Sequence, residues 1–279
     1  MLGTALLIAY PAAAATLHVG GDGNYAVPST AIAAARDGDT IEIAAGVYEN
    51  DYAIVRAHRL RLIGSGGKAV LKSKGLIPNG KAIWVVKGTD VHVENVEFRG
   101  ARVRDRNGAG IRQEGRNLTL RHCGFFDNEN GILSGHRENS VIDIRHCEFA
   151  HNSLTAHPAS HNLYIGRVAK LVFKFNYSHH ARVAHLLKSR ARENVIVCNR
   201  IGDESDGTSS YVINLPNGGR ARIAGNILHQ GANSMNAVMV ACGEEGVSGK
   251  RNALYVVNNT LINDRQRGHP IFVQIRNVS

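Results

Sequence analysis

The stretch 161–190 holds the densest group of side chains that can transfer protons or bind anions. Within it, apolar residues alternate with polar ones, as Leu163 and Ile165 do around Tyr164. Such alternation predicts β-strands with one buried face. Because successive side chains of a strand point to opposite faces, Tyr164 and Lys188 should project from the outer face of a sheet.

Lys188 is the strongest candidate for a catalytic residue. A nearby cation and partial burial both lower the pKa of a lysine, and a neutral amine can act as a general base. Arg190 follows two residues later on the same face, roughly 6.6 Å along the strand. The competing interpretation is a solvated lysine that covers the sheet.

Three further side chains suit an anionic sugar. The guanidinium groups of Arg190 and Arg112 can each bind a carboxylate as a fork. Tyr164 can transfer a proton or stack on a sugar ring. An ordinary half-exposed aromatic on a sheet is the alternative for Tyr164.

Histidines are unusually dense between residues 151 and 185. They are His151, His157, His161, His179, His180 and His185. His161 and His185 each precede a predicted strand, so we expect them at the rim of a groove as catalytic candidates. His179 and His180, with Asn162 and Asn214, are predicted substrate contacts. No carboxylate joins the histidines at metal-ligand spacing, so a histidine-bound metal is not the favoured interpretation.

An acidic loop follows in the segment IGDESDGTSS. Asp203, Glu204 and Asp206 offer the oxygen ligands that calcium prefers. Acidic residues are also common in ordinary turns. Calcium is therefore the one cofactor that the sequence suggests, with these three residues as its weak candidate ligands.

A repeat places these residues in a fold. Its copies are the segments 91–98, 118–125, 141–149, 171–178, 196–201, 222–228 and 255–262. Each has alternating aliphatic residues and one fixed position, held by Val96, Cys123, Cys147, Asn176, Asn199, Asn226 and Asn259. Repeats of short strands without helices predict a β-solenoid, whose coils stack about 4.8 Å apart. Stacked Asn side chains can then hydrogen-bond along a column, which satisfies buried polar groups.

The repeat, together with the opening segment DGDTIEIAAGVYE, resembles the right-handed parallel β-helix proteins of the pectate-lyase-like superfamily over residues 40–279. The resemblance implies an all-β solenoid. We expect one such domain over residues 16–279, with a short capping helix at 29–35 and Ser29 or Thr30 as its N-cap.

A second strand in each coil should bring the candidate residues together. Aligning the coils predicts one outward column, which reads Arg112, Leu133, Tyr164, Lys188, Asn214 and Val240. An error of one residue in the alignment of a strand would exchange its predicted buried and exposed side chains.

The composition and the N-terminal residues indicate the class of binding partner and the cellular location. The net charge is +10 and the isoelectric point about 9.7, which favours a polyanionic partner. Nucleic-acid motifs are missing from the sequence, so an acidic polysaccharide is preferred, although a merely basic protein is the alternative. Residues 1–15 resemble a signal-peptide remnant, which predicts a periplasmic or extracellular protein. No stretch is long enough for a membrane span, and we expect a monomer.

The four cysteines leave one question open. Cys123 and Cys147 occupy matching repeat positions, so stacked free thiols are favoured over a disulfide bridge between them. An exported protein could hold either arrangement.

The column resembles that of β-helical lyases of the alginate lyase and chondroitinase B type, which carry a mid-sheet lysine in a context like Lys188-Ser189. That resemblance implies β-elimination on a uronic-acid-containing polysaccharide. Arg190 would neutralise the substrate carboxylate, Lys188 would be the base, and Tyr164 or a histidine the acid. The sequence departs from the family at two places. The family has an arginine acid where residues 211–215 lie here, and acidic calcium ligands where Ala181 and Val183 stand here.

Two other functions stay open. A C5-epimerase would share the chemistry and reprotonate the opposite face of the sugar. A non-catalytic polysaccharide-binding or adhesin β-helix would have a diffuse polar patch. A hydrolase is disfavoured because the column offers no paired carboxylates.

Overall fold

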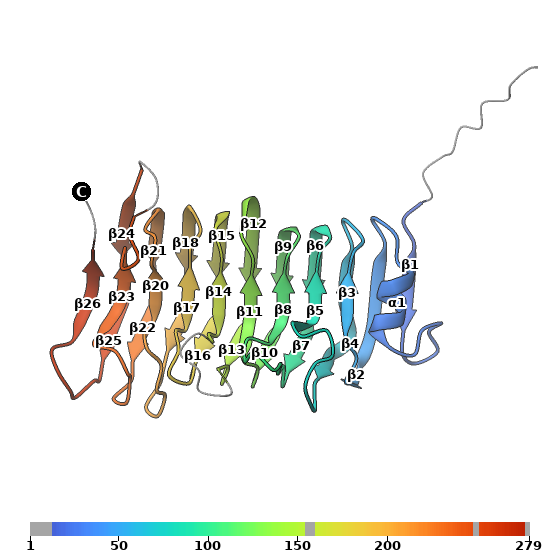
Figure 1. Cartoon of the computed structure of the whole chain (residues 1–279), viewed down its shortest axis with the longest axis horizontal. Helices are drawn as coiled ribbons and strands as arrows, with labels where there is room; N and C mark the ends of the chain where they lie inside the picture. Colours follow the sequence, from blue (N-terminus) through green and yellow to red (C-terminus); the bar gives the residue numbers. More distant parts are fainter. Residues whose placement is uncertain (1–12, 154–159, 248–250, 277–279) are drawn as a thin grey trace, which may run out of the picture.

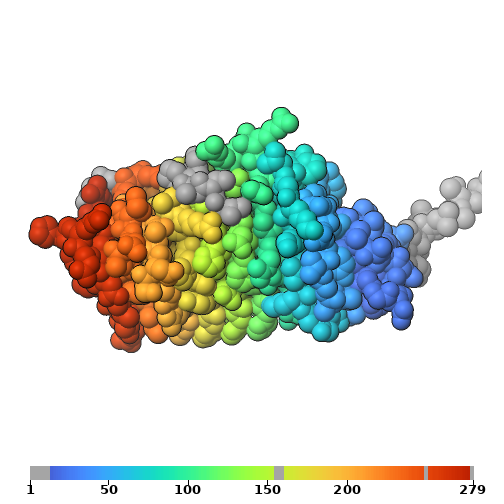
Figure 2. Space-filling view, turned by 90° about the horizontal axis from the view of Figure 1, so that it is seen from below, coloured from blue at the N-terminus to red at the C-terminus, as the bar shows by residue number. Residues whose placement is uncertain are grey.

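The chain forms a parallel β-solenoid. The structure is a computed structural model that describes residues 13–153, 160–247 and 251–276. Each regular coil contains three short strands, and every strand pairs in parallel with its equivalent one coil away. Figure 1 shows the coils following one another from β1 and α1 to β26, and Figure 2 shows the same order from blue to red.

Two of the three strands in each coil belong to a 17-stranded sheet. It begins with β1 (Thr16–Val19), β2 (Thr40–Glu49) and β4 (Arg61–Lys72). The first strands of the regular coils are β6 (Thr89–Glu94), β9 (Arg116–Arg121), β12 (Arg137–Arg145), β15 (Val168–Lys174), β18 (Glu193–Val197), β21 (Arg220–Ala224) and β24 (Ala253–Val257). The second strands are β7 (Val96–Arg99), β10 (Gly124–Phe126), β13 (Glu148–Ala150), β16 (Tyr177–His179), β19 (Arg200–Gly202), β22 (Ile227–Gln230) and β25 (Thr260–Asn263).

The third strand of each coil belongs to a separate nine-stranded sheet. Its members are β3 (Ala53–Val55), β5 (Ala82–Val86), β8 (Ala109–Gln113), β11 (Asn130–Ser134), β14 (Leu163–Ile165), β17 (Leu187–Ser189), β20 (Ile213–Leu215), β23 (Val238–Cys242) and β26 (Ile271–Ile275). This sheet carries Tyr164 and Lys188.

A left-handed residue bends the chain between the first and second strands. The residue before each fixed repeat position has a positive φ; these residues are Asn95, His122, His146, Phe175, Cys198, Gly225 and Asn258. Each repeat segment therefore contains two short strands joined by this bend, so each regular coil has three strands where the sequence predicted a repeat strand and one second strand. Asn and Gly adopt this conformation readily, and the other residues are held in it by the stack.

The predicted asparagine column is confirmed. The backbone N–H and side-chain amide of Asn176 both donate to Asn199 Oδ1, at 2.9 and 3.1 Å. Asn199 donates in the same way to Asn226, and Asn226 to Asn259. Cys147 continues the column, because its N–H donates to Asn176 Oδ1.

Thiols and aromatic rings fill the rest of the interior. Cys123 and Cys147 are buried free thiols, and the Cys123 N–H points at Cys147 Sγ at 3.4 Å. The favoured prediction of stacked thiols is thus confirmed. Phe98, Phe125 and Phe149 stack on one another in the interior, and Phe173 packs at a tilt against Phe149.

Helix α1 (Pro28–Ala34) lies beside β1, β2 and β3 at the first end of the stack and buries Ala31 and Ile32. Its N-cap residue is Val27, so the predicted Ser29 or Thr30 cap is wrong. The reason is Pro28, whose fixed φ suits the first helical position. The capping role of α1 stays a prediction.

Some predictions fall on residues outside the described ranges. They include the first twelve residues of the predicted signal segment 1–15, and His157. Among the described residues, no helix has the length and apolar character that crossing a membrane requires.

Candidate functional site

The outer face of the nine-stranded sheet carries the predicted column. Cross-strand neighbours pair Arg112 with Leu133, Leu133 with Tyr164, Tyr164 with Lys188, and Lys188 with Asn214. The register is therefore confirmed for these five residues. Tyr164 and Lys188, which are 24 positions apart in the sequence, lie on adjacent strands.

The sixth position of the column was wrong by one residue. Asn214 pairs with Ala241, and Val240 pairs with Ile213 on the inner face. All five residues of β23 are buried. An uninterrupted apolar strand gives no alternation from which inside and outside can be read.

Arg190 connects the residues at the centre of the site. Its Nε donates to the Tyr164 hydroxyl at 2.8 Å, and its Nη1 donates to Asn217 Oδ1 at 2.6 Å. Its Nη2 lies 2.6 Å from Glu245 Oε2, and Lys188 Nζ lies 3.1 Å from Glu245 Oε1. We call Tyr164, Lys188, Arg190 and Glu245 the Arg190 cluster. It combines a phenol, an amine, a guanidinium and a carboxylate on one face.

Burial strengthens the ionic contacts of the cluster. The side chains of Lys188 and Arg190 are each 13% exposed. Burial alone lowers the pKa of Arg190, but hydrogen bonds with Glu245 and Tyr164 outweigh it and raise that pKa. Burial raises the pKa of Glu245, and the bonds from Arg190 and Lys188 outweigh it and hold that pKa below its usual value.

The neighbouring carboxyl group behaves oppositely. Burial raises the pKa of Glu244. One Glu244 oxygen accepts from Asn214 Nδ2 at 3.2 Å, and the other is buried without a hydrogen bond from the described residues. Adjacent carboxyls with opposite pKa shifts are typical of acid–base sites.

Sequence reasoning missed Glu244 and Glu245. They lie just past the end of β23, in the segment Gly243–Gly246, and Glu245 is 57 positions from Lys188. The argument that disfavoured a hydrolase, the lack of paired carboxylates, therefore does not hold. The one available signal is two adjacent acids directly after a buried strand of the same sheet.

The structure buries His161 inside the coil and not at a groove rim, whereas His185 beside it is half-buried. His161 is 2% exposed, and its ring stacks between Tyr164 and His185 at centroid distances of 5.7 and 4.7 Å. The Nδ1 atoms of His161 and His185 accept the backbone N–H groups of His185 and Tyr211. Each ring thus accepts a hydrogen bond from the backbone of the next coil and helps to hold successive coils together.

Burial keeps both imidazoles neutral. It lowers the pKa of His161 well below its usual value. It also lowers the pKa of His185 to about 3, with a further contribution from the Lys188 cation. Neutral rings are poor proton donors, so the predicted catalytic role is disfavoured. His161 instead supports the ring of Tyr164.

The two neutral rings predict a loss of stability in acid. A folded-state pKa below the unfolded value of about 6.5 means that the unfolded chain binds more protons. For His185 this stability is fully present above about pH 6.5 and is lost as the pH falls toward 3, by roughly 1.4 kcal/mol per pH unit. The pKa of His161 is also lowered, so His161 contributes in the same direction.

Denaturant unfolding at pH 7 and pH 5 measures this loss. His185→Gln should flatten the dependence, because glutamine keeps an acceptor and cannot be protonated there. His122→Gln is the control, since His122 is exposed. An equal flattening by both substitutions would contradict the assignment to His185.

Two predicted substrate contacts do not reach the surface. Asn162 is fully buried, and its amide donates to Phe149, Ser178 and His179 in the interior. Asn214 is 2% exposed and is covered by Glu244. Asn162 thus belongs to the core, and Asn214 positions a carboxyl group.

The acidic loop does not bring its three weak candidate calcium ligands together. Asp203 is buried and accepts from the N–H and hydroxyl of Ser209, and burial raises its pKa to about 6. Glu204 pairs with Arg200, and Asp206 with His180. Because the three carboxyl groups turn to different partners, they do not converge on one ion.

Arg112 stands apart from the Arg190 cluster. It lies two strands from Tyr164, or roughly 10 Å by strand spacing. Leu133 lies between them and packs on Ala82, Val85 and Ala109. One strand, with the apolar side chain of Leu133, therefore separates Arg112 from the strand that carries Tyr164.

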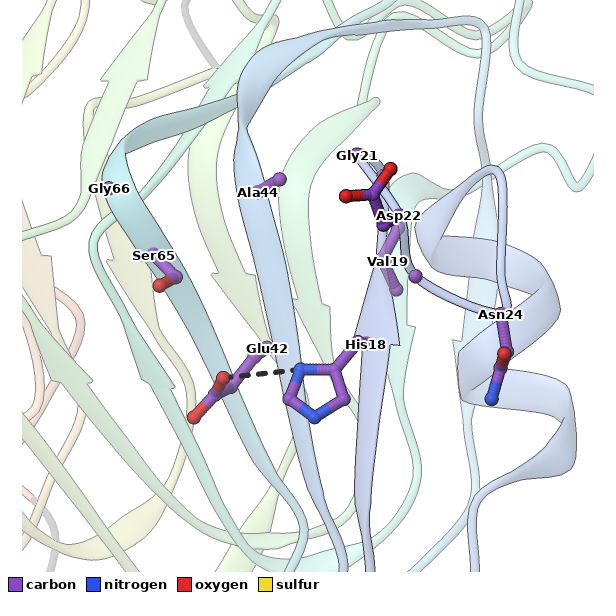
Figure 3. Close-up of a pocket in the computed structure, with 11 residues that line it drawn as sticks. His18, Val19, Gly21, Asp22, Asn24, Glu42, Ala44, Ser65 and Gly66 are labelled. Atoms are coloured by element: carbon purple, nitrogen blue, oxygen red, sulfur yellow. Dashed lines mark ion pairs between the residues drawn. The ribbon is translucent and has the colours of Figure 1, made fainter.

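A surface hollow at the N-terminal end is a weaker candidate site (Figure 3). His18 and Glu42 form an ion pair of 3.3 Å there, beside Asp22 and Ser65. Neither Lys nor Arg is among the residues that line it. Its acidic lining does not suit an anionic ligand.

Comparison with known proteins supports the fold. No protein-family model matches the sequence, and no curated protein matches it. Pectin methylesterase PemA from Erwinia chrysanthemi is similar with a TM-score of 0.51 and 11% identity, over 95% of this chain and 94% of that one. A mutant of the PL6 family alginate lyase AlyGC is similar with a TM-score of 0.51 and 12% identity, over 93% of this chain and 41% of that one. The chain shares the parallel β-helix fold of these two proteins.

The names of these two neighbours state different activities, one a lyase and the other an esterase. The chain spans less than half the length of the alginate lyase and nearly all of the pectin methylesterase. At this level of identity the likeness concerns the fold alone. The function must therefore be argued from the Arg190 cluster.

Proposed function

We propose that the protein cleaves a uronic-acid-containing polysaccharide by β-elimination at the Arg190 cluster. The observation that carries this proposal is the binding mode of Arg190. Its guanidinium holds a carboxylate, Glu245, while its Nε contacts the phenol of Tyr164. A uronate carboxylate bound in place of Glu245 would have its C5 carbon one bond away, within the same group of side chains.

The reaction needs three contributions. The substrate carboxylate must be neutralised so that the C5 proton becomes acidic, a base must take that proton, and an acid must protonate O4 as the C4–O4 bond breaks. The electrons of the C5–H bond form the new C4–C5 double bond. Arg190 suits the first task because it is charged and partly buried.

The contacts of the cluster favour a revised division of the other two tasks. Lys188 Nζ lies 3.1 Å from Glu245 Oε1, at the centre of the cluster, where an ammonium group could donate a proton to O4, which suits the acid. The Tyr164 oxygen receives a hydrogen bond from the Arg190 cation, which would stabilise a developing phenolate and suits the base. We therefore propose Tyr164 as base and Lys188 as acid, the reverse of the sequence-based expectation.

A panel of acidic polysaccharides tests the reaction class. Elimination produces an unsaturated uronate that absorbs in the ultraviolet, whereas epimerisation leaves the chain length unchanged. Ultraviolet-absorbing product from any uronate polymer supports the proposal. Binding of such polymers without any chemical change would instead favour the adhesin alternative.

A substrate with a better leaving group tests the assignment of acid and base. Fluoride departs from C4 without needing a proton. Lys188→Ala should therefore lose most activity on the natural glycoside. On a 4-fluoro uronide it should keep a share of the unaltered protein's activity about 10²-fold larger than on the natural substrate. The opposite pattern, with rescue of Tyr164→Phe, would restore Lys188 as the base.

Glu245 should compete with the substrate carboxylate for Arg190. Replacing it with glutamine removes this competition, so uronate oligosaccharides should bind roughly 5–10-fold more tightly, as expected for about 1 kcal/mol. Calorimetric titration measures the change. Glu193→Gln is the matched control, because Glu193 forms an ion pair with Lys170 on the other sheet. Weaker binding by Glu245→Gln would mean that the carboxylate contacts the substrate directly.

Hydrolysis is a second candidate, favoured by one observation. Glu244 and Glu245 are adjacent carboxyls whose pKa values shift in opposite directions. Glu244, whose pKa is raised, would serve as the acid, and Glu245, whose pKa is lowered, as the base toward a glycoside or an ester. New reducing ends or released alcohol without an ultraviolet-absorbing product would select this alternative.

A further inference from the structure

Three imidazoles cluster at the turns that lead into the nine-stranded sheet, outside the Arg190 cluster. One ring nitrogen from each of His151, His179 and His180 lies within 4.8 Å of the others. His151 follows strand β13, His179 ends β16 and His180 follows it, so two successive coils contribute. The ring of His151 lies 5.0 Å from that of His180 and 5.9 Å from that of His179.

Hydrogen bonds with carboxylates determine which nitrogen of each ring carries a proton. His179 Nε2 lies 3.2 Å from Glu148 Oε1, and His180 Nε2 lies 2.9 Å from Asp206 Oδ1. An ionised carboxylate only accepts hydrogen bonds, so each Nε2 must be the N–H donor. In a neutral imidazole the Nδ1 atom then bears a lone pair.

The two Nδ1 atoms face each other at 2.5 Å. Two lone pairs at this separation repel each other, unless a positive centre lies at or beside them. A shared proton would satisfy two rings. The third imidazole, His151, indicates a centre that more than two nitrogens can bind.

We propose that His151, His179 and His180 bind one first-row transition metal ion of the zinc type. Imidazole nitrogens suit such ions, whereas calcium prefers oxygen ligands. Glu148 and Asp206 complete the carboxylate–histidine–metal arrangement that orients ligand rings.

The spacing suits a small closure of the site around the ion. Zinc–nitrogen bonds of about 2.0–2.1 Å place tetrahedral ligand atoms roughly 3.4 Å apart. The 2.5 Å pair must open slightly and His151 must approach. Three protein ligands leave a fourth position for water or another small ligand.

The bound ion would connect three coils. His151 and Glu148 come from one coil, His179 and His180 from the next, and Asp206 from the one after. The ion would hold the ends of β13 and β16 to the loop that carries Asp206. The inference is independent of the β-elimination proposal, because none of its ligands belongs to the Arg190 cluster.

Zinc titration of the full chain, prepared without a polyhistidine tag and stripped with a chelator, tests the site. Calorimetry should show one Zn²⁺ per chain, and Ca²⁺ should not bind there. Asp206→Asn should weaken zinc binding by about 10–100-fold. The Asp206 side chain is 82% exposed, so this substitution leaves the packing intact. His180→Ala should weaken binding further and remove the tetrahedral visible spectrum of bound Co²⁺.

His146→Ala is the matched control. His146 is exposed and stacks on His122 in the same solenoid, but it is not part of the three-histidine cluster. It should bind zinc like the unaltered protein. Absence of zinc binding would overturn the proposal in favour of a shared proton, and binding that survives both Asp206→Asn and His180→Ala would show adventitious surface sites.

Discussion

Tyr164→Phe is expected to lower kcat by about 10²–10⁴-fold, the usual contribution of a positioned proton-transfer group. Phenylalanine keeps the ring that stacks on His161 and lies near the Lys188 and Arg190 cations. The substitution removes only the hydroxyl that receives the Arg190 hydrogen bond. KM and thermal stability should therefore change little. Initial rates of ultraviolet-absorbing product on the best polysaccharide measure the effect.

Tyr177→Phe provides the matched control for that experiment. Tyr177 also lies on the solenoid surface and bonds to a charged side chain, because its hydroxyl donates to Glu204. Burial and Glu204 raise its pKa to about 12, which makes it a poor proton donor at neutral pH. Full activity of Tyr177→Phe and loss in Tyr164→Phe is the expected pair of results. Full activity in both would remove Tyr164 from the mechanism.

The parts of the fold that repeat could be predicted from the sequence. Alternation predicts which side chains of a strand face outward, and the stacking of coils brings equivalent positions together. Tyr164 and Lys188 were therefore placed correctly on adjacent strands. The asparagine column followed for the same reason, since Asn176 and Asn199 occupy one repeat position.

The parts that lie on irregular loops could not be predicted. Glu245 reaches Lys188 from the segment that follows β23, and no periodic pattern fixes where that segment turns. The burial of His161 was missed because a polar ring looks exposed in the sequence. In the structure, His161 takes the place of an asparagine, since its own N–H donates to Asn130 Oδ1 while its ring accepts from the next coil.

The Arg190 cluster thus combines residues on the sheet, whose positions the sequence predicts, with residues on loops, whose positions it does not. The sheet sets the order of Tyr164 and Lys188, and loops one and two coils away add Asn217 and Glu245. Loops of a β-helix can change without disturbing the stack, because the strands hold the coils together. This separation explains how similar solenoids carry different activities, and why the Arg190 cluster informs the function more than the fold does.

Asn199→Ala is expected to destabilise the protein by roughly 2–5 kcal/mol, the cost of leaving one or two buried polar groups unpaired. Asn199 is 3% exposed, and its Oδ1 accepts both the backbone and side-chain N–H groups of Asn176. Its amide donates to Phe173 and Asn226. Alanine removes all four bonds in the middle of the stack, where water cannot replace them.

Denaturant unfolding measures this loss as a lower midpoint at an unchanged slope. Asn259→Ala is the matched control, because Asn259 is the last rung of the same column and is partly exposed. Its bonds to Asn226 resemble those of Asn199 to Asn176, but water can reach the freed groups, so the loss should be about 1 kcal/mol. An equal loss of unfolding free energy in both variants would contradict this prediction. It would mean that burial does not determine how much each asparagine of the column contributes to stability.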